Sequence, residues 1–486
     1  MQYIPYQKFT KEVGIFSLTN LLVGLKGLII LPIITKLLGT ESYGIWAQIM
    51  VTISLTTLLV TLGLPYTLVR FLPAEKDKKE IQDGVYSVLS LVFIVGLIIS
   101  IFFIFFSKSI ANFFGTDSIL IKILAFIILF ECFNLVFLNI FRAFREIKKY
   151  SFFVIFQAVA ETSLIIVAIS FGYGILGAIL ALLIASLTVF LIMGWVVIKK
   201  IGVKIPHFSR TKKYLSFGLP GIPANISSWI VQSSDRYLIG FFWGATFVGY
   251  YSPAYALGNI ITFFIAPLSF TLPAVLSKFF DENQINEVKV HLKYSLKYFL
   301  MVAIPSVFGL SILSKQLLLI FSTSEIASRG YLVVFPVALS ILLLGIYTVI
   351  VQIIILRKRT IIIGAIWMIA ALLNLGLNFI FIPKFGIMGA AITTLIAYTT
   401  VFIITWHYSF RGFKFNIDWK FIIKSIFASV LMTLFIIWFS PIGLLKTIIA
   451  IISGALLYGI LILLFKGFNK KEIEFLKGFL KTNLGE

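Results

Sequence analysis

Runs of about 20 apolar residues, separated by short polar loops, recur along the whole of this 486-residue chain. A helix of that length crosses the roughly 30 Å hydrocarbon layer of a bilayer, where only helices and closed barrels satisfy their backbone hydrogen bonds. Charged residues make up 12% of the chain, about half of the fraction in a soluble domain. The chain is therefore predicted to be an all-α polytopic membrane protein.

The apolar runs predict about fourteen transmembrane helices, and the loops between them are too short to form a separate domain. The predicted parts are an N-lobe of six helices (1–198), a cytoplasmic basic linker (199–213), a C-lobe of six helices (214–410), two further helices (411–466) and a cytoplasmic amphipathic tail (467–486).

An internal repeat supports the two six-helix lobes. The segment GILGA from Gly174 matches GIMGA from Gly386, and GTESYG from Gly39 matches GATFVG from Gly244, with offsets of 212 and 205 residues. An even number of spans per repeat keeps both lobes in one orientation, so we expect a pseudo-twofold axis along the membrane normal. The alternative is that glycine-rich turns recur by chance.

The net charge of +22 indicates topology rather than nucleic-acid binding. If the N-terminus is inside, the inner loops hold 32 of the 41 basic residues. Cytoplasmic loops carry such an excess of Lys and Arg, and basic residues also attract anionic lipid. We therefore expect a multi-pass protein of the cytoplasmic membrane with both termini in the cytoplasm.

The chain offers little to a catalytic or metal site. Cys132 is its single cysteine, the three histidines are scattered, and the outer loops hold few acidic residues. Enzymatic chemistry needs a positioned acid, base or metal. We therefore expect no catalytic residues, no metal and no cofactor.

Five charged residues lie within predicted spans: Lys26, Glu131, Glu161, Asp235 and Arg236. A charge at the bilayer centre costs about 2.5–3.5 kcal/mol, so it usually faces a cavity or a partner. Asp235 and Arg236 are neighbours whose side chains point about 100° apart on a helix. We therefore expect each of these two to have its own partner or role.

The seventh predicted span, over residues 214–242, carries a polar stripe. On a helical wheel Asn225, Ser228 and Gln232 share one face, with Asp235 and Arg236 on its flanks. The prolines of the preceding GLPGIP are expected to bend or break the helix near the cytoplasm. The neutral residues could simply hydrogen-bond between helices.

Lys26 and Arg236 place one cation on the first helix of each repeat. Arg holds phosphate through paired hydrogen bonds and Lys acts as a point charge, so these cations suit an anionic ligand in a cavity. The alternative for each is a buried ion pair with one of the three embedded acids. Arg70 and other basic residues at inner helix ends would make the cytoplasmic mouth basic.

Three segments resemble a known family. They are LPIITKLLGTESYGIWAQ from Leu31, TLGLPYTLVRFLP from Thr61 and SDRYLIGFFWGATFVGYYSPAY from Ser234. They are similar to the oligosaccharide or polysaccharide flippases of the multidrug/oligosaccharidyl-lipid/polysaccharide exporter (MATE-like) superfamily. The resemblance extends over essentially the whole chain, although each motif alone is degenerate.

The resemblance implies a flippase that moves a polyprenyl-(pyro)phosphate-linked oligosaccharide from the inner to the outer leaflet by alternating access, for cell-surface polysaccharide biosynthesis. The driving force is left open between Na⁺ coupling, H⁺ coupling and the membrane potential alone, and we expect contact with membrane lipids and with glycan-assembly proteins, and a monomer. The candidate residues are Lys26, Arg236 and Arg70 for phosphate, Asn225, Gln232 and Asn259 for sugar, and Asp235, Glu131 and Glu161 for ion coupling.

Two related functions stay open. A lipid-linked peptidoglycan precursor flippase differs only in its substrate. A MATE-type ion-coupled drug or cation antiporter would be expected to carry a carboxylate in the first lobe's cavity. Lys26 in the first span argues against the antiporter, whereas Glu131 and Glu161 keep it open.

Overall fold

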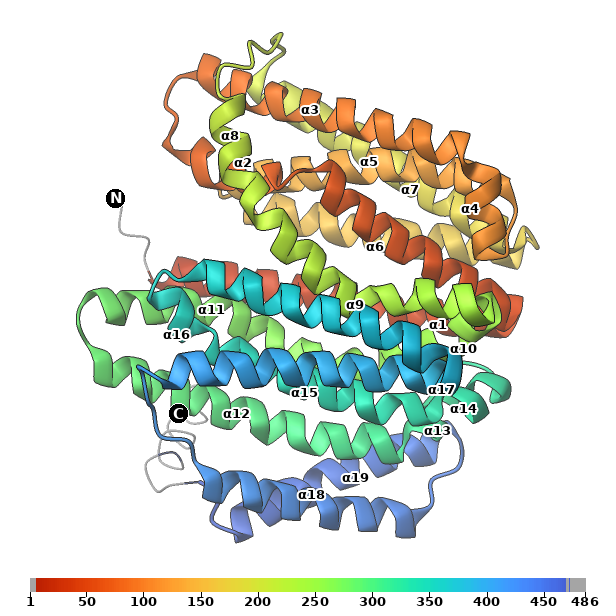
Figure 1. Ribbon diagram of the computed structural model, residues 1–486, viewed down its shortest axis with the longest axis vertical. Coiled ribbons are helices and arrows are strands. Elements are labelled where there is room, and N and C mark those ends of the chain that lie inside the picture. The colour runs from red at the N-terminus through yellow and green to blue at the C-terminus, as the bar shows by residue number, and fades with distance from the viewer. Residues whose placement is uncertain (1–5, 469–471, 473–486) are drawn as a thin grey trace. The chain divides into compact units, whose positions relative to one another are not determined.

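The computed structural model of the chain describes residues 6–468 and 472, and all regular structure in that part is helical (Figure 1). Most of the predicted tail, residues 469–471 and 473–486, lies outside the described residues. The helices are α1 (Tyr6–Val60), α2 (Leu64–Phe71), α3 (Lys78–Phe105), α4 (Ser107–Phe114), α5 (Ser118–Ala143), α6 (Ile147–Ser170), α7 (Gly174–Ile201), α8 (Thr211–Gly218), α9 (Ile222–Trp243), α10 (Ala245–Gly258), α11 (Thr262–Asp281), α12 (Ile285–Ile312), α13 (Ser314–Phe321), α14 (Ser324–Gly330), α15 (Val334–Ile350), α16 (Gln352–Leu356), α17 (Thr360–Phe410), α18 (Trp419–Phe439) and α19 (Gly443–Leu464).

Eleven helices in the described part of the chain are long and apolar enough to cross a membrane, which confirms the predicted all-α membrane fold. The long helices α1 and α17 each contain one non-helical residue, Gly39 and Gly386, so each consists of two helices joined at a kink. Each of them covers two of the predicted spans. The helix with the polar stripe, α9, is not among the eleven, and the count of fourteen stays a prediction.

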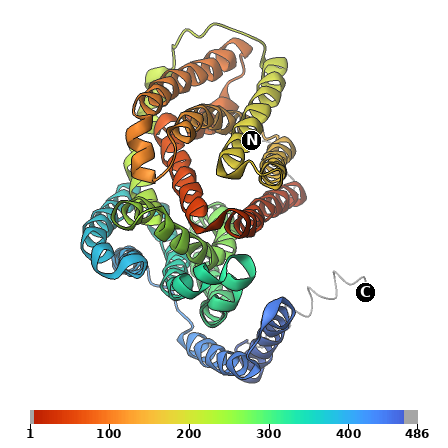
Figure 2. The ribbon, with the colours of Figure 1, turned by 90° about the vertical axis from the view of Figure 1, so that its right-hand side faces the viewer.

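The chain divides into two compact units. The first comprises Met1–Pro253, Phe321–Ile326 and Ile361–Ala397. Within it α5, α6 and α7 pack on one another, α3 packs on α5, and α1 contacts both α6 and α9. Figure 2 shows the helices of this unit nearly end-on. The lobe boundaries predicted from the repeat stay a prediction.

The second unit comprises Ala254–Ile320, Ala327–Thr360 and Tyr398–Glu486. Within it α12 is central, because it contacts α11, α15 and α18. The two C-terminal helices α18 and α19 pack on each other, and α18 lies against α12 (Figure 1).

The glycines that define the repeat share unusual backbone conformations. Gly39 has φ 85° and ψ 178°, and its counterpart Gly244 has φ 84° and ψ 173°. Only glycine readily adopts this region. Gly174 and Gly386 also agree, with φ of 59° and 58°. Gly39 and Gly244 therefore form equivalent turns, and Gly174 and Gly386 share a positive φ.

The two glycine turns also meet in a reciprocal contact inside the first unit. A Cβ on Gly44 would lie 1.8 Å from the carbonyl oxygen of Ala245, and a Cβ on Gly249 would lie 2.0 Å from that of Thr40. Thr40 and Ala245 occupy the same place in the repeat, directly after its first glycine. Contacts that exchange equivalent residues are those that a twofold axis produces, as the repeat predicted.

The predicted break before the polar stripe is confirmed. Pro220 lies in the 3₁₀ turn Leu219–Gly221 between α8 and α9, and Pro223 lies in the first turn of α9. Proline at these positions loses no intrahelical hydrogen bond. The residues of the stripe therefore lie on the regular helix α9.

The end of the predicted basic linker is attached to the first unit. The Asp83 carboxylate accepts hydrogen bonds from the backbone N–H of His207 at 2.6 Å and from a hydroxyl of the same segment. Arg210 forms ion pairs with Glu75 and Glu80. These contacts hold the chain that leads into α8 and α9 against the start of α3.

We predict that Gly44→Ala destabilises the protein, by about 1–3 kcal/mol or more, because the added methyl group overlaps a backbone carbonyl that cannot rotate away. The midpoint of thermal unfolding in detergent measures the effect. Gly376→Ala is the control, since that helical glycine has no atom within 4 Å of the added Cβ. Equal midpoints for wild type and Gly44→Ala would show that the close contact does not exist.

Candidate functional site

Lys26, in the first half of α1, forms an ion pair with Oε2 of Glu161 on α6. The Glu161 side chain is 5% exposed and that of Lys26 is 20% exposed. The open alternatives for Lys26 were a cavity and a buried ion pair. The structure shows the ion pair, with the acid enclosed and the lysine side chain partly exposed.

The ion pair extends into a network over four helices. The side-chain amide of Gln157 on α6 donates to Oε1 of Glu161 and to Oε1 of Glu131 on α5, both at 2.8 Å. The hydroxyl of Ser186 on α7 also donates to Glu131. We call Lys26, Glu161, Gln157, Glu131 and Ser186 the N-lobe network.

The N-lobe network holds two carboxylates but one ammonium. Glu131 is held by neutral donors, Gln157 and Ser186, and shares the first of them with Glu161. If both acids were ionised, the network would carry one negative charge inside the membrane-spanning part of the protein. Such a charge is costly there. A proton or a second cation bound to the N-lobe network would neutralise this charge.

Asp235 and Arg236 contact each other, contrary to the expectation that neighbours on a helix do not pair. Oδ1 of Asp235 accepts from Nη1 of Arg236 at 2.7 Å and from its backbone N–H at 2.9 Å. The same Nη1 donates to the carbonyl oxygen of Gln232, one turn earlier. The helical wheel gave the direction of each Cβ, whereas the long arginine side chain turns back along the helix.

The pair is enclosed by α10. The Tyr251 hydroxyl donates to Oδ2 of Asp235, and the Arg236 guanidinium lies over the Tyr251 ring, 5.3 Å from its centre. Asp235 is 1% exposed and Arg236 is 7% exposed. Both carboxylate oxygens of Asp235 are therefore engaged within the first unit, and its charge is compensated.

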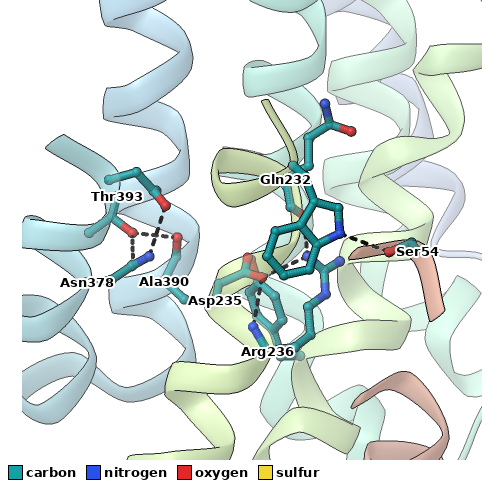
Figure 3. A network of polar contacts seen from close by, with 10 residues as sticks. Ser54, Gln232, Asp235, Arg236, Asn378, Ala390 and Thr393 are labelled. Carbon is teal, nitrogen blue, oxygen red and sulfur yellow. Dashed lines mark hydrogen bonds and ion pairs between the residues drawn. The ribbon is translucent and has the colours of Figure 1, made fainter. Parts of the chain in front are cut away.

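A second polar group lies on α17 in the same unit. Thr393 donates to Oδ1 of Asn378 and, at 2.9 Å, to the carbonyl oxygen of Ala390. Asn378 donates in turn to Oδ1 of Asn374 at 3.1 Å. Figure 3 shows Asn378, Ala390 and Thr393 on the side of Asp235 away from Ser54. Carbonyl, amide and hydroxyl oxygens thus form a polar group within α17.

The remaining candidate residues are not drawn into these clusters. Arg70 is exposed in the last turn of α2. Asn225 and the side chain of Gln232 are exposed on α9. Asn259 is half-buried and belongs to the second unit. Their roles in binding stay predictions.

Sequence reasoning missed two contacts between α1 and α9. The indole N–H of Trp229 donates to the Ser54 hydroxyl at 2.8 Å (Figure 3), and the hydroxyls of Tyr237 and Thr52 are 2.7 Å apart. Apolar and aromatic residues are expected throughout a membrane helix, so no pattern marked these rings. The polar stripe beside them was the one available signal.

The profile of the family described as polysaccharide biosynthesis protein matches residues 9–280, more than half of the chain. The protein belongs to this family. The matched region contains the N-lobe network, Asp235, Arg236 and all of α9.

Two curated relatives of this family member come from Haloferax volcanii. A probable low-salt glycan biosynthesis flippase is 24% identical over 269 residues, which are 54% of this chain and 57% of the relative. A probable flippase is 28% identical over 247 residues, 49% of this chain and 50% of the relative. The chain thus spans about half the length of the curated relatives it matches.

Solved structures show the fold of this family member. A lipid II flippase, MurJ, in an inward closed conformation gives a TM-score of 0.76 at 22% identity, over 93% of this chain and 98% of that one. An inward-facing multidrug resistance MATE family transporter of the MOP superfamily gives 0.70 at 17% identity, over 82% and 98%. The chain has the MurJ- and MATE-like fold of that superfamily.

We predict strong coupling between Lys26 and Glu161. Lys26→Met leaves a carboxylate enclosed without its cation, which costs about 3–5 kcal/mol. Adding Glu161→Gln should recover much of that loss. Thermal unfolding of the two single variants and the double variant measures the coupling. Losses that add within about 0.5 kcal/mol would contradict it.

The control for this cycle is Lys149→Met. Lys149 pairs with Glu146 at 3.1 Å, but its side chain is 49% exposed. An exposed ion pair contributes roughly 0–1 kcal/mol, so this variant should unfold close to the wild-type midpoint.

Proposed function

We propose that this protein is a flippase that moves a polyprenyl-(pyro)phosphate-linked oligosaccharide from the inner to the outer leaflet of the cytoplasmic membrane by alternating access. The single observation that carries the proposal is the partly exposed side chain of Lys26 on a membrane-spanning helix, whose ammonium pairs with an enclosed carboxylate. The family and the printed functions of the Haloferax relatives support it. The protein would act as a transporter in cell-surface polysaccharide biosynthesis.

Lys26 is the better first contact for the substrate phosphate. The Lys26 side chain is 20% exposed, whereas that of Arg236 is 9% exposed and contacts Asp235 and Tyr251. An arriving phosphate would compete with Glu161 for the ammonium. Exchange of one anion for another lets the site bind substrate without leaving a bare cation in the membrane.

Partner exchange at Lys26 would couple substrate to a proton or cation. When phosphate takes Lys26, Glu161 and Glu131 are left as two acids that share Gln157. One acid must then gain a proton or another cation to avoid two negative charges side by side. The membrane potential adds about 2.3 kcal/mol per 100 mV for each charge that crosses.

Asp235 offers a second place for a coupling Na⁺ or H⁺. In the view of Figure 3, its carboxylate is drawn between Arg236 and the α17 group of Asn378, Thr393 and Ala390. Hard cations prefer such carboxylate, amide, hydroxyl and carbonyl oxygens. Protonation of Asp235, or Na⁺ bound beside it, would add one positive charge to α9 and leave that of Arg236 uncompensated in the same step.

The proposed setting is a multi-pass protein with both termini in the cytoplasm, acting as a monomer beside glycan-assembly proteins. A lipid-linked peptidoglycan precursor is the second candidate substrate, favoured by the likeness to the lipid II flippase over 93% of this chain. Both substrates present a phosphate next to a glycan, so Lys26 would serve either.

The first test is transport. We predict that Lys26→Gln in proteoliposomes lowers the rate of translocation of a synthetic polyprenyl-diphosphate oligosaccharide at least tenfold at equal protein content. The exposed Lys315, on α13, provides the control variant Lys315→Gln. A wild-type rate in Lys26→Gln would remove Lys26 from the site, and absence of transport by wild type would reject the flippase.

The second test concerns coupling. Asp235→Asn keeps the shape of the side chain and removes its charge, so transport driven by an imposed Na⁺ or proton gradient should lose its dependence on that gradient. Translocation is measured with each gradient applied separately. If Asp235→Asn responds to both gradients as wild type does, the coupling site lies elsewhere, with the acids of the N-lobe network as the remaining candidates.

A further inference from the structure

Two aromatic side chains of α9 are fixed by hydrogen bonds to α1. Trp229 donates its indole N–H to Ser54 at 2.8 Å, and Tyr237 exchanges a hydrogen bond with Thr52 at 2.7 Å. The two ring centres are 5.9 Å apart and the planes are inclined by 45°. Because each polar tip is held at the helix seam, the orientation of both rings is set before any ligand arrives.

More rings support Tyr237 from α4 and continue the row. Phe114, which is buried, stacks on Tyr237 with centres 6.0 Å apart, and Phe113 lies 6.5 Å from the same ring. Phe241 stacks on Phe113 at 6.1 Å. Trp229, Tyr237, Phe113 and Phe241, which we call the aromatic row, thus lie along one side of α9.

The aromatic row borders the polar stripe. Trp229 is four residues from Asn225 and three from Gln232, which places these side chains within about 40–60° of one another on the helix. The polar side chains of Asn225, Gln232 and Ser54 are exposed, and the Trp229 side chain is half-buried. Amides in membrane-embedded helices face protein or a water-filled cavity rather than lipid. The exposed part of Trp229 therefore lies beside hydrogen-bonding groups.

This combination suits a sugar ring. A pyranose has a face of C–H groups, which packs on an aromatic ring, and hydroxyl groups around its edge, which exchange hydrogen bonds with amides and hydroxyls. We propose that the aromatic row, with Gln232 and Asn225 beside it, is the surface on which the glycan of the lipid-linked substrate lies. The inference rests on the proposed flippase function and assigns the glycan to this seam, separate from the phosphate contact at Lys26.

Fixed rings lower the cost of binding, because rigid side chains lose little rotamer freedom when the ligand arrives. A platform of this kind recognises the shape of a sugar ring more than its pattern of hydroxyl groups. The selectivity of transport would then come from the neighbouring amides, and Trp229 would contribute to binding of many pyranoses.

The first experiment measures glycan binding without transport. The purified full-length protein is titrated with a panel of soluble oligosaccharides of gluco-, galacto- and manno-configured pyranoses, and saturation-transfer NMR reports binding. We expect Trp229→Ala to weaken binding of the bound members roughly tenfold or more, in line with the loss of one stacking ring. Trp229→Phe should keep part of the affinity because it keeps a ring.

Two further variants separate stacking from folding. Ser54→Ala removes the hydrogen bond that fixes the indole but leaves the ring, so it should weaken binding less than Trp229→Ala. Trp195→Ala is the matched control, since Trp195 is an exposed tryptophan on α7. Wild-type affinity in Trp229→Ala, or no binding of any panel member to wild type, would overturn the assignment.

The second experiment distinguishes this inference from the proposed function. Proteoliposomes receive either the polyprenyl-diphosphate oligosaccharide or the same lipid without sugar. Trp229→Ala should lose translocation of the first lipid and keep that of the second at the wild-type rate. Equal losses for both lipids would mean a structural role for Trp229. If wild type moves neither lipid but binds glycan in a way that depends on Trp229, the flippase function is rejected. The aromatic row then still stands as a glycan-binding surface.

Discussion

A charge inside a bilayer has to find its partner within the protein, and this constraint accounts for the arrangement of the first unit. Lys26 forms an ion pair with Glu161, and the second acid, Glu131, accepts hydrogen bonds from Gln157 and Ser186. The hydrophobic effect does not hold helices together in lipid. Polar contacts of this kind therefore help decide which helices α1 contacts and at what height along its length.

The kinked helix α1 links the two candidate regions. Before the kink at Gly39 it carries Lys26 of the N-lobe network, and after the kink it carries Thr52 and Ser54, which hold the rings of α9. A shift of the first half of α1 on partner exchange at Lys26 would pass through one glycine to the second half. The proposed phosphate contact lies on α1, and the rings proposed to contact the glycan are held by hydrogen bonds to the same helix.

The sequence predicts the membrane fold, the repeat and the embedded charges because each depends on local patterns along the chain. The matching conformations of Gly39 and Gly244 agree with the repeat at that position. The pairing of charges depends on which helices become neighbours, which a single sequence does not encode locally. The wrong expectation for Asp235 and Arg236 has a simpler cause: a helical wheel describes where a side chain starts, and arginine is long enough to return to its neighbour.

The reciprocal contact of Gly44 and Gly249 has a mechanical consequence. Two helices meet there largely through backbone atoms, with the methyl group of Thr40 beside Gly249. Such a crossing resists a small rotation of one helix against the other less than a contact made of interdigitated side chains would. Resistance to movement would then arise at the hydrogen bonds and ion pairs between helices rather than at the crossing. The rate of a transport cycle would be governed by how quickly those hydrogen bonds change partners.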